Sequence, residues 1–320
     1  MPARVNSKPA VEIVAGGALV AVPVLIAALV ESGAGERGYG WLLVPIFLGL
    51  FLLVHGVARL PHDSRVPISR VAGFVLPILC GCIILTAWWG GSALNMFPIG
   101  TVPSPDEVGD AFRAEISSGR LLADIIASLY RVSWGFASAV VFAVPLGLVI
   151  GRHAATRYAL LPTINFFRSL SPIAWIPFAI IWFGVGDPPA IFIIFIATFF
   201  QVVLATAAAA GSVPRIYYKV AEDLGMRGRA VLFHITLPAI LPQLVTALRV
   251  AIGVAWMVVV AAEMIAVRSG LGFLIVDARN GLRMDLVVCG MITIGAIGIA
   301  LDMIFSRLAR IPSLRWGFEQ

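Results

Sequence analysis

Long apolar runs separated by short polar segments dominate the chain. Eight runs are continuous rather than alternating, and most approach the length of about 20 residues that a helix needs to cross a bilayer core. We therefore predict an all-α integral membrane protein. The predicted spans are residues 11–30, 39–58, 71–91, 128–150, 173–185, 189–210, 239–267 and 286–305.

The fifth predicted span is short, and the segment before it, residues 157–170, is of mixed polarity. This segment is expected to lie in the inner interface before the chain enters the bilayer. Pro162, Pro172 and Pro177 predict a broken helix here, because proline lacks a backbone donor and clashes with the preceding turn.

The first apolar run has the charged flank of a signal peptide in Arg4 and Lys8, but it is long for one. A second span follows almost at once, so we expect a retained helix that forms a hairpin with it. The basic segment after this hairpin predicts a boundary between an N-terminal hairpin and linker, residues 1–68, and a six-span domain, residues 69–320.

In the longest outer segment, residues 95–127, Asp106 and Glu107 mark the first turn of a helix, where carboxylates suit the helix dipole. With the N-terminus inside, the inner loops carry more than twice as many Arg and Lys residues as the outer loops, Arg168 being counted with the inner group. Both termini are therefore expected in the cytoplasm.

Composition narrows the class of protein further. Sixty per cent of the residues are hydrophobic and only 12% are charged. A water-facing surface needs more charge than that, so a soluble enzyme, a disordered chain and a nucleic-acid binder are excluded. The four His and three Cys residues show no metal-ligand spacing, and no metal site is predicted.

The inner segment at residues 211–241 interrupts two spans with a polar, mixed-charge sequence. Val220, Leu224 and Val231 recur near helical spacing, which predicts a short amphipathic helix, and Gly225 lies where that helix bends or stops. Such a helix could dock in a groove of a soluble partner. The alternative is an ordinary inner loop with a helix lying on the membrane surface.

The layout of this segment resembles the EAA loop of bacterial ABC-importer permeases: Ala221 is followed by Gly225 and, after nine more residues, by Ile235-x-Leu237-Pro238. Lys219 occupies the position where the family usually has its leading Glu. The resemblance implies a coupling helix near residues 213–231 that sits in a cleft of a separate ATPase subunit. It implies ATPase-coupling roles for Lys219, Ala221, Glu222, Asp223, Leu224, Gly225, Met226 and Arg227, with a hinge at Leu237 and Pro238.

Other motifs resemble the branch of this family that serves sulfonates, taurine, nitrate and bicarbonate. They are VPSP (102–105), SLYRV (128–132), RSLSPIAWIP (168–177), WFGVG (182–186), LR (248–249), AEM (262–264) and SGLG (269–272). The resemblance covers about residues 71–316 and implies the six-span core of a type I importer. The first two spans have no counterpart in it.

The resemblance also implies partners and a location. Two copies would form the path in a bacterial inner membrane, two ATPase subunits would bind ATP and magnesium inside, and a substrate-binding protein would deliver a small anion outside. The chain itself contains no G-x-x-x-x-G-K-[ST] phosphate loop and is not expected to be an enzyme. No cofactor is expected in it.

Polar and aromatic residues inside the predicted spans, or in the segment that leads into the fifth span, are candidates for the translocation path, because burying polar groups in lipid is costly. They are Asn165, Ser169, Ser171, Trp175, Gln201 and Glu263. Hydrogen bonding and packing between helices explain the same residue types. Glu263 is expected to pair with Arg268 or an Arg of the outer segment, and Arg249 to anchor the loop or bind another helix, with Asp302 free to snorkel or pair with an inner Arg.

Two other functions compete with an ABC permease. A secondary transporter or channel would carry several charged residues at mid-membrane depth and have related halves. An intramembrane enzyme would place a nucleophile and base, or a metal site, inside its spans. Neither pattern is conspicuous in the sequence.

Overall fold

The computed structural model describes residues 81, 84–85, 88–92 and 101–309. The chain divides into two compact units, Met1–Ala111 and Phe112–Gln320. The predicted spans at residues 11–30 and 39–58, the predicted boundary at residue 68 and most of the predicted span at residues 71–91 lie outside the described residues.

Helix α4 (Pro105–Ser117) begins where the sequence predicts, with Asp106 and Glu107 in its first turn. The backbone N–H of Glu107 donates to the Ser104 hydroxyl at 3.3 Å, and the Ser104 N–H donates to the Glu107 carboxylate at 2.9 Å. These reciprocal bonds form a capping box, which satisfies two backbone donors that the helix leaves free.

Four described helices are long and apolar enough to cross a membrane, or five if a bent pair counts as one span. They are α5 (Arg120–Arg152), α8 (Asp187–Ser212), α11 (Leu237–Ala266) and α13 (Met284–Ala309). The regular elements of the described part of the chain are all helices, with no strand among them. The remaining elements after α5 are α6 (Ala154–Ser169), η2 (Pro172–Trp175), α7 (Ile176–Phe183), α9 (Arg215–Asp223), α10 (Arg229–Val231), η3 (Leu232–Thr236) and α12 (Leu271–Asn280).

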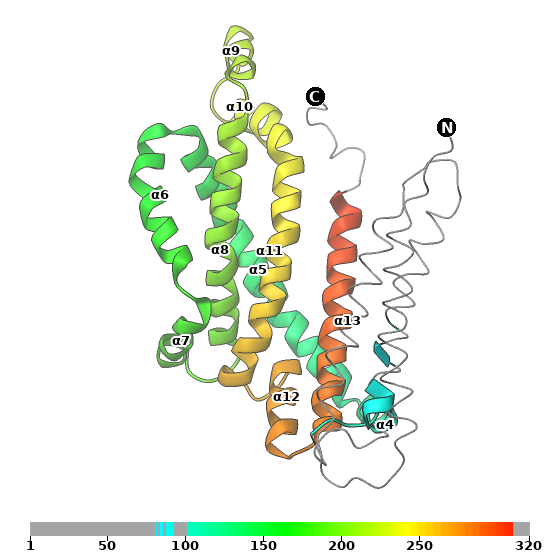
Figure 1. The fold of residues 1–320 in the computed structure, drawn as a ribbon. Coiled ribbons are helices and arrows are strands. Elements are labelled where there is room, and N and C mark those ends of the chain that lie inside the picture. The colour runs from blue at the N-terminus through cyan, green and yellow to red at the C-terminus, as the bar shows by residue number, and fades with distance from the viewer. Residues whose placement is uncertain (1–80, 82–83, 86–87, 93–100, 310–320) are drawn as a thin grey trace, which may run out of the picture. The chain divides into compact units, whose positions relative to one another are not determined.

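The bent pair is α6 with η2 and α7, which meet at 87°. Leu170 and Ser171 are extended at the break, as expected before Pro172, whose ring disfavours helical geometry in the preceding residue. The broken helix predicted here is therefore confirmed. The expectation that residues 157–170 lie in the interface is wrong: α6 runs beside α8, and the ring of Phe167 stacks on that of Phe200 at 5.8 Å (Figure 1).

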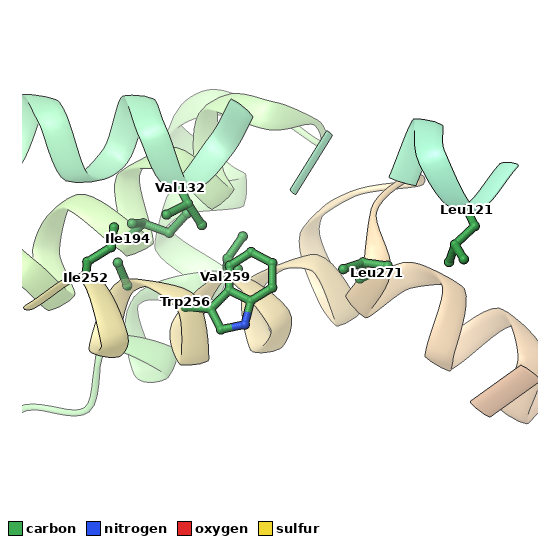
Figure 2. Close-up of a cluster of buried hydrophobic side chains, with 8 residues drawn as sticks. Leu121, Val132, Ile194, Ile252, Trp256, Val259 and Leu271 are labelled. Atoms are coloured by element: carbon green, nitrogen blue, oxygen red, sulfur yellow. The ribbon is translucent and has the colours of Figure 1, made fainter. Parts of the chain in front are cut away.

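Two further boundaries differ from the sequence prediction. Helix α5 begins at Arg120 rather than at residue 128, because Leu121 is buried in a cluster with Leu271 and has a packing partner beyond the predicted span (Figure 2). Helix α12 lies between two predicted spans where no helix is predicted. In both cases the determining contact is distant in sequence.

Small residues allow α5 and α8 to pack closely. Gly135, Ala139, Ala143, Gly147 and Gly151 recur every fourth residue and so form one face of α5. A Cβ atom on Gly147 would lie 2.6 Å from Cβ of Thr206 and 2.7 Å from the carbonyl oxygen of Val203, both on α8. Such close approach is the usual basis of helix association in membranes.

We expect Gly147→Ala to destabilise the protein by about 1–3 kcal/mol, because the added methyl group must push two long helices apart. The thermal midpoint of the detergent-solubilised protein measures this. Gly253→Ala is the matched control, since Gly253 is also inside a long helix but has nothing within 4 Å of the added atom. Equal midpoints for the two variants would contradict the packing argument.

The core beside this contact joins α5, α8 and α11 through Val132, Ile194, Ile252, Trp256 and Val259 (Figure 2). The indole N–H of Trp256 donates to the carbonyl oxygen of Ile294 at 3.0 Å, which connects α13 to the same core. The bundle places α9 and α10 at one end and α7 and α12 at the other (Figure 1).

Candidate functional site

The first candidate site is α9, which lies between two long helices at one end of the bundle (Figure 1). The predicted short amphipathic helix is present. Ala221 is buried at 1% exposure, whereas Ile216, Val220 and Leu224 are 60%, 48% and 73% exposed. The charged side chains of Lys219, Glu222, Asp223 and Arg227 are also exposed. The helix therefore presents both apolar and charged groups away from the described bundle.

Gly225 ends α9, as its position in the sequence indicates. Its N–H donates to the carbonyl oxygen of Glu222 at 2.9 Å, and the N–H of Met226 donates to that of Ala221 at 2.8 Å. This is a Schellman motif, in which the residue after the cap takes a left-handed conformation. The φ of Gly225 is +76°, which a glycine adopts without a steric penalty.

The chain then returns toward the bundle through α10 and η3 into α11, with Leu237 and Pro238 at the start of α11. The segment Leu232–Thr236 is a wide π-type turn. Pro238 has no N–H to donate to the preceding turn, which accounts for the widened turn at the predicted hinge. Leu237 packs against the buried cluster that contains Ile240 and Leu148, so the residues of the predicted hinge contact the core near the end of α5.

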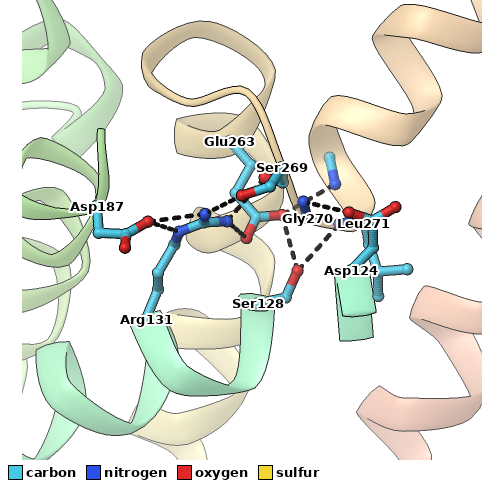
Figure 3. Close-up of polar contacts among 9 residues, drawn as sticks. Asp124, Ser128, Arg131, Asp187, Glu263, Ser269, Gly270 and Leu271 are labelled. Atoms are coloured by element: carbon cyan, nitrogen blue, oxygen red, sulfur yellow. Dashed lines mark hydrogen bonds and ion pairs between the residues drawn. The ribbon is translucent and has the colours of Figure 1, made fainter. Parts of the chain in front are cut away.

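The second candidate site is a buried ionic network at the opposite end of the bundle. The guanidinium of Arg131 on α5 donates to the carboxylates of Glu263 at 2.6 Å and Asp187 at 2.8 Å (Figure 3). It also donates to the carbonyl oxygen of Ser269 at 2.8 Å and to its hydroxyl at 2.6 Å. Glu263 is fully buried, and the Arg131 side chain is 2% exposed.

The same network holds the turn that leads into α12. The hydroxyl of Ser128 donates to Glu263 at 2.9 Å and accepts the N–H of Leu271 at 3.0 Å, while the N–H of Gly272 donates to Glu263 at 2.9 Å. The N–H of Gly270 donates to Asp124 at 2.7 Å. A Cβ on Gly270 would lie 2.5 Å from both Arg131 and Glu263, and its φ is +102°, so the turn requires glycine there.

These contacts bring residues from several motifs that are far apart in the sequence together in one buried site. The SLYRV, AEM and SGLG motifs supply Ser128 and Arg131, Glu263, and Ser269–Gly272 respectively, and Asp187 directly follows the WFGVG motif. The predicted pairing of Glu263 with Arg268 or an Arg of residues 95–127 is wrong; its partner is Arg131. The sequence analysis missed Arg131, Ser128 and Asp187 as site residues.

A second ion pair joins α11 to α13. Arg249 donates to both carboxylate oxygens of Asp302, at 2.7 and 2.6 Å. The expectation that Arg249 binds another helix, and the alternative that Asp302 pairs with an Arg, are confirmed. The two side chains are 42% and 54% exposed, so this pair lies on the surface of the described bundle.

We expect Arg249→Asp to lower the thermal midpoint of the protein by a few degrees, because two carboxylates would then face each other between α11 and α13. The swapped pair, Arg249→Asp with Asp302→Arg, should recover most of the loss. Thermal unfolding of the single and double variants in detergent measures the coupling. A double variant no more stable than the single one would show that the pair does not hold the helices together.

The residues predicted for a path fall in two places. Asn165 lines a hollow of about 510 Å³ between α6 and α8. The Ser169 hydroxyl donates to the carbonyl oxygen of Asn165 at 2.9 Å, and Ser171 is exposed at the helix break. Trp175 packs among the rings of Phe167, Phe178 and Trp182.

Gln201 is partly buried on α8, one residue beyond Phe200. Glu263 lies apart from this group, in the buried network with Arg131.

Comparison with known proteins identifies related sequences and a solved structure of similar fold. The profile of the family described as binding-protein-dependent transport system inner membrane component matches residues 143–316. The taurine transport system permease protein of Escherichia coli is 32% identical over 251 residues, covering 77% of this chain and 90% of that protein. The nitrate import permease protein of Synechocystis is 37% identical, covering 56% of this chain and 65% of that protein.

A solved structure of the inward-facing MetNI methionine ABC transporter has a TM-score of 0.54 at 17% identity. The match covers 59% of this chain and 94% of that one. At this level of identity the match establishes a similarity of fold alone.

Proposed function

This chain belongs to the family of binding-protein-dependent transport system inner membrane components, and we propose that it forms half of the path of an ATP-driven importer for a small anion. It is a permease subunit rather than an enzyme, and ATP hydrolysis belongs to a separate subunit. A second copy of the chain completes the path, and an external binding protein supplies the solute.

The observation that carries this proposal is the geometry of α9. A short helix with exposed Ile216, Val220 and Leu224 has an apolar face without a partner in the described bundle. Its end is fixed by the Schellman motif at Gly225, so it can transmit force as a rigid element. A groove on an ATPase subunit is a suitable partner for such a helix.

The path from α9 into the bundle supports a coupling role. Movement of α9 passes directly to α8 on one side and, through the hinge at Leu237 and Pro238, to α11 on the other. These two helices pack together and enter the core around Trp256. Closure of two ATPase subunits would thus rock the long helices between inward-open and outward-open arrangements.

The same reasoning assigns orientation and substrate class. The α9 end carries Arg215, Lys219, Arg227 and Arg229, which favours the cytoplasmic side by the positive-inside rule. The chain then lies in a bacterial inner membrane, with both termini on the cytoplasmic side. A small anion is supported by the names of relatives that serve taurine and nitrate.

Affinity purification from native membranes tests this proposal. We expect an ATPase subunit to co-purify in an amount equal to the permease, and vesicles containing the complex to take up nitrate or taurine only when ATP is hydrolysed. A non-hydrolysable nucleotide is the control and should stop uptake. Uptake that follows an imposed ion gradient without ATP would instead establish a secondary transporter.

A further inference from the structure

Arg168 does not lie in an inner loop, where the sequence analysis counted it. It directly follows Phe167, whose ring is stacked on Phe200 with an interplanar angle of 7°. Phe200 is near the middle of α8 (Asp187–Ser212), one of the helices long enough to cross the membrane. Arg168 is therefore near the middle of the span, at the end of α6 where the chain breaks (Figure 1).

The side chain of Arg168 is exposed, and its guanidinium has no ion pair or hydrogen bond to any residue that the structure describes. Arg131 and Arg249 differ in this respect, since each binds a carboxylate through two nitrogens. A mid-depth cation facing hydrocarbon is strongly unfavourable, so such residues normally face a water-filled space or a partner. Arg168 is thus available for a ligand.

The chain on both sides of Arg168 lacks carboxylates over a long stretch of sequence. No Asp or Glu occurs from residue 125 to residue 186, which includes all of α6, η2 and α7. The acidic residue of α8 is Asp187, at its outer end, and Arg131 already binds it. Ser169 and Ser171 are both exposed beside the break. The Ser169 hydroxyl already donates its proton to the carbonyl oxygen of Asn165, whereas the Ser171 hydroxyl donates to no residue that the structure describes and can donate to a ligand.

We infer that Arg168, with the hydroxyl of Ser171, binds the oxyanion group of the solute halfway through the membrane. This inference rests on the proposed function, because it requires a path for an anion between two copies of the chain. A guanidinium binds sulfonate, nitrate or carboxylate oxygens in its plane and remains charged at any physiological pH. Arg168 therefore determines selectivity for anions within the membrane, after the external binding protein has released the solute.

The test uses the native host with substitutions in the chromosomal gene, so that every partner is present, and measures uptake of labelled nitrate and taurine. Arg168→Gln should reduce uptake at least about tenfold, as expected when a hydrogen bond to a charged group is lost. Arg168→Lys should keep most of it. Arg307→Gln is the matched control, because it removes an exposed cation at the end of α13. The amount of assembled complex in the membrane is measured for each variant.

A second measurement does not depend on the solute. The Arg168→Cys variant should react with a membrane-impermeant thiol reagent, and the wild-type chain should not at the same rate. Lack of reaction, or uptake in Arg168→Gln equal to that in Arg307→Gln, would overturn the inference while leaving the importer intact. If the wild-type strain takes up neither probe beyond a deletion strain, the anion part of the proposed function fails, and this inference with it.

Discussion

Replacing Arg131 with methionine should lower the free energy of unfolding by about 3–5 kcal/mol, the usual result of removing one partner of a buried ion pair. The reason is the fate of Glu263, which is fully buried and would lose its cation. The same substitution removes the bonds to Asp187 and Ser269. The ends of α8 and α11 and the start of α12 would then lose their common partner on α5.

A double substitution separates charge from packing. Arg131→Met with Glu263→Met removes both charges and keeps side chains of similar length, so it should be markedly more stable than Arg131→Met alone. Arg131→Lys keeps the charge but cannot match the forked geometry, and should fall between the wild type and Arg131→Met. Thermal unfolding in detergent gives the order. If the double variant were as unstable as the single one, packing rather than an unpaired carboxylate would be the cause.

The long helices could be predicted from sequence because hydropathy is a local property. The predicted spans at residues 128–150, 189–210, 239–267 and 286–305 each fall almost entirely inside one long helix of the structure. Helix α9 could be predicted for a similar reason, since an apolar spacing and a glycine cap are local signals. The break in the fifth span follows from Pro172 alone.

The errors concern properties that depend on distant parts of the chain. The start of α5 depends on Leu121 meeting Leu271, and the partner of Glu263 lies 132 residues earlier. The two residues of each pair are too far apart in the sequence for a local pattern to connect them. The depth of Arg168 was misjudged because it depends on α6 running beside α8, which Phe167 and Phe200 establish only in three dimensions.

The two ends of the bundle have different physical characters, which bears on how the protein moves. At one end, Arg131 holds three other segments through short charge-assisted bonds, and Gly270 leaves no space for a side chain. At the other end, α9 is held by the chain on either side, by the packing of Ala221 and by Tyr218, whose ring packs against the cluster around Leu148 and lies under the guanidinium of Arg152. The proposed function requires this difference, since α9 would move and pass its motion through α8 and α11 as a lever against the opposite, firmly bonded end.

The most direct test of that lever is Gly225→Val, which should reduce ATP-driven uptake about tenfold or more while leaving insertion and stability near normal. A β-branched residue at φ +76° is strained by about 1–2 kcal/mol or more, so the Schellman turn should open and α9 should reorient against its partner. Nothing lies within 4 Å of the added Cβ, so no clash accompanies the strain.

Gly225→Asn is the matched control, because asparagine adopts the left-handed conformation more readily than other non-glycine residues. It should retain a large part of the uptake. Both variants are compared by uptake in vesicles and by the amount of ATPase that co-purifies. Full uptake by Gly225→Val would show that the end of α9 need not be rigid. Equal losses in both variants would mean that a side chain at this position, rather than its backbone conformation, disturbs the contact with the ATPase. The added Cβ has open space around it in the isolated chain, and an ATPase subunit could fill that space.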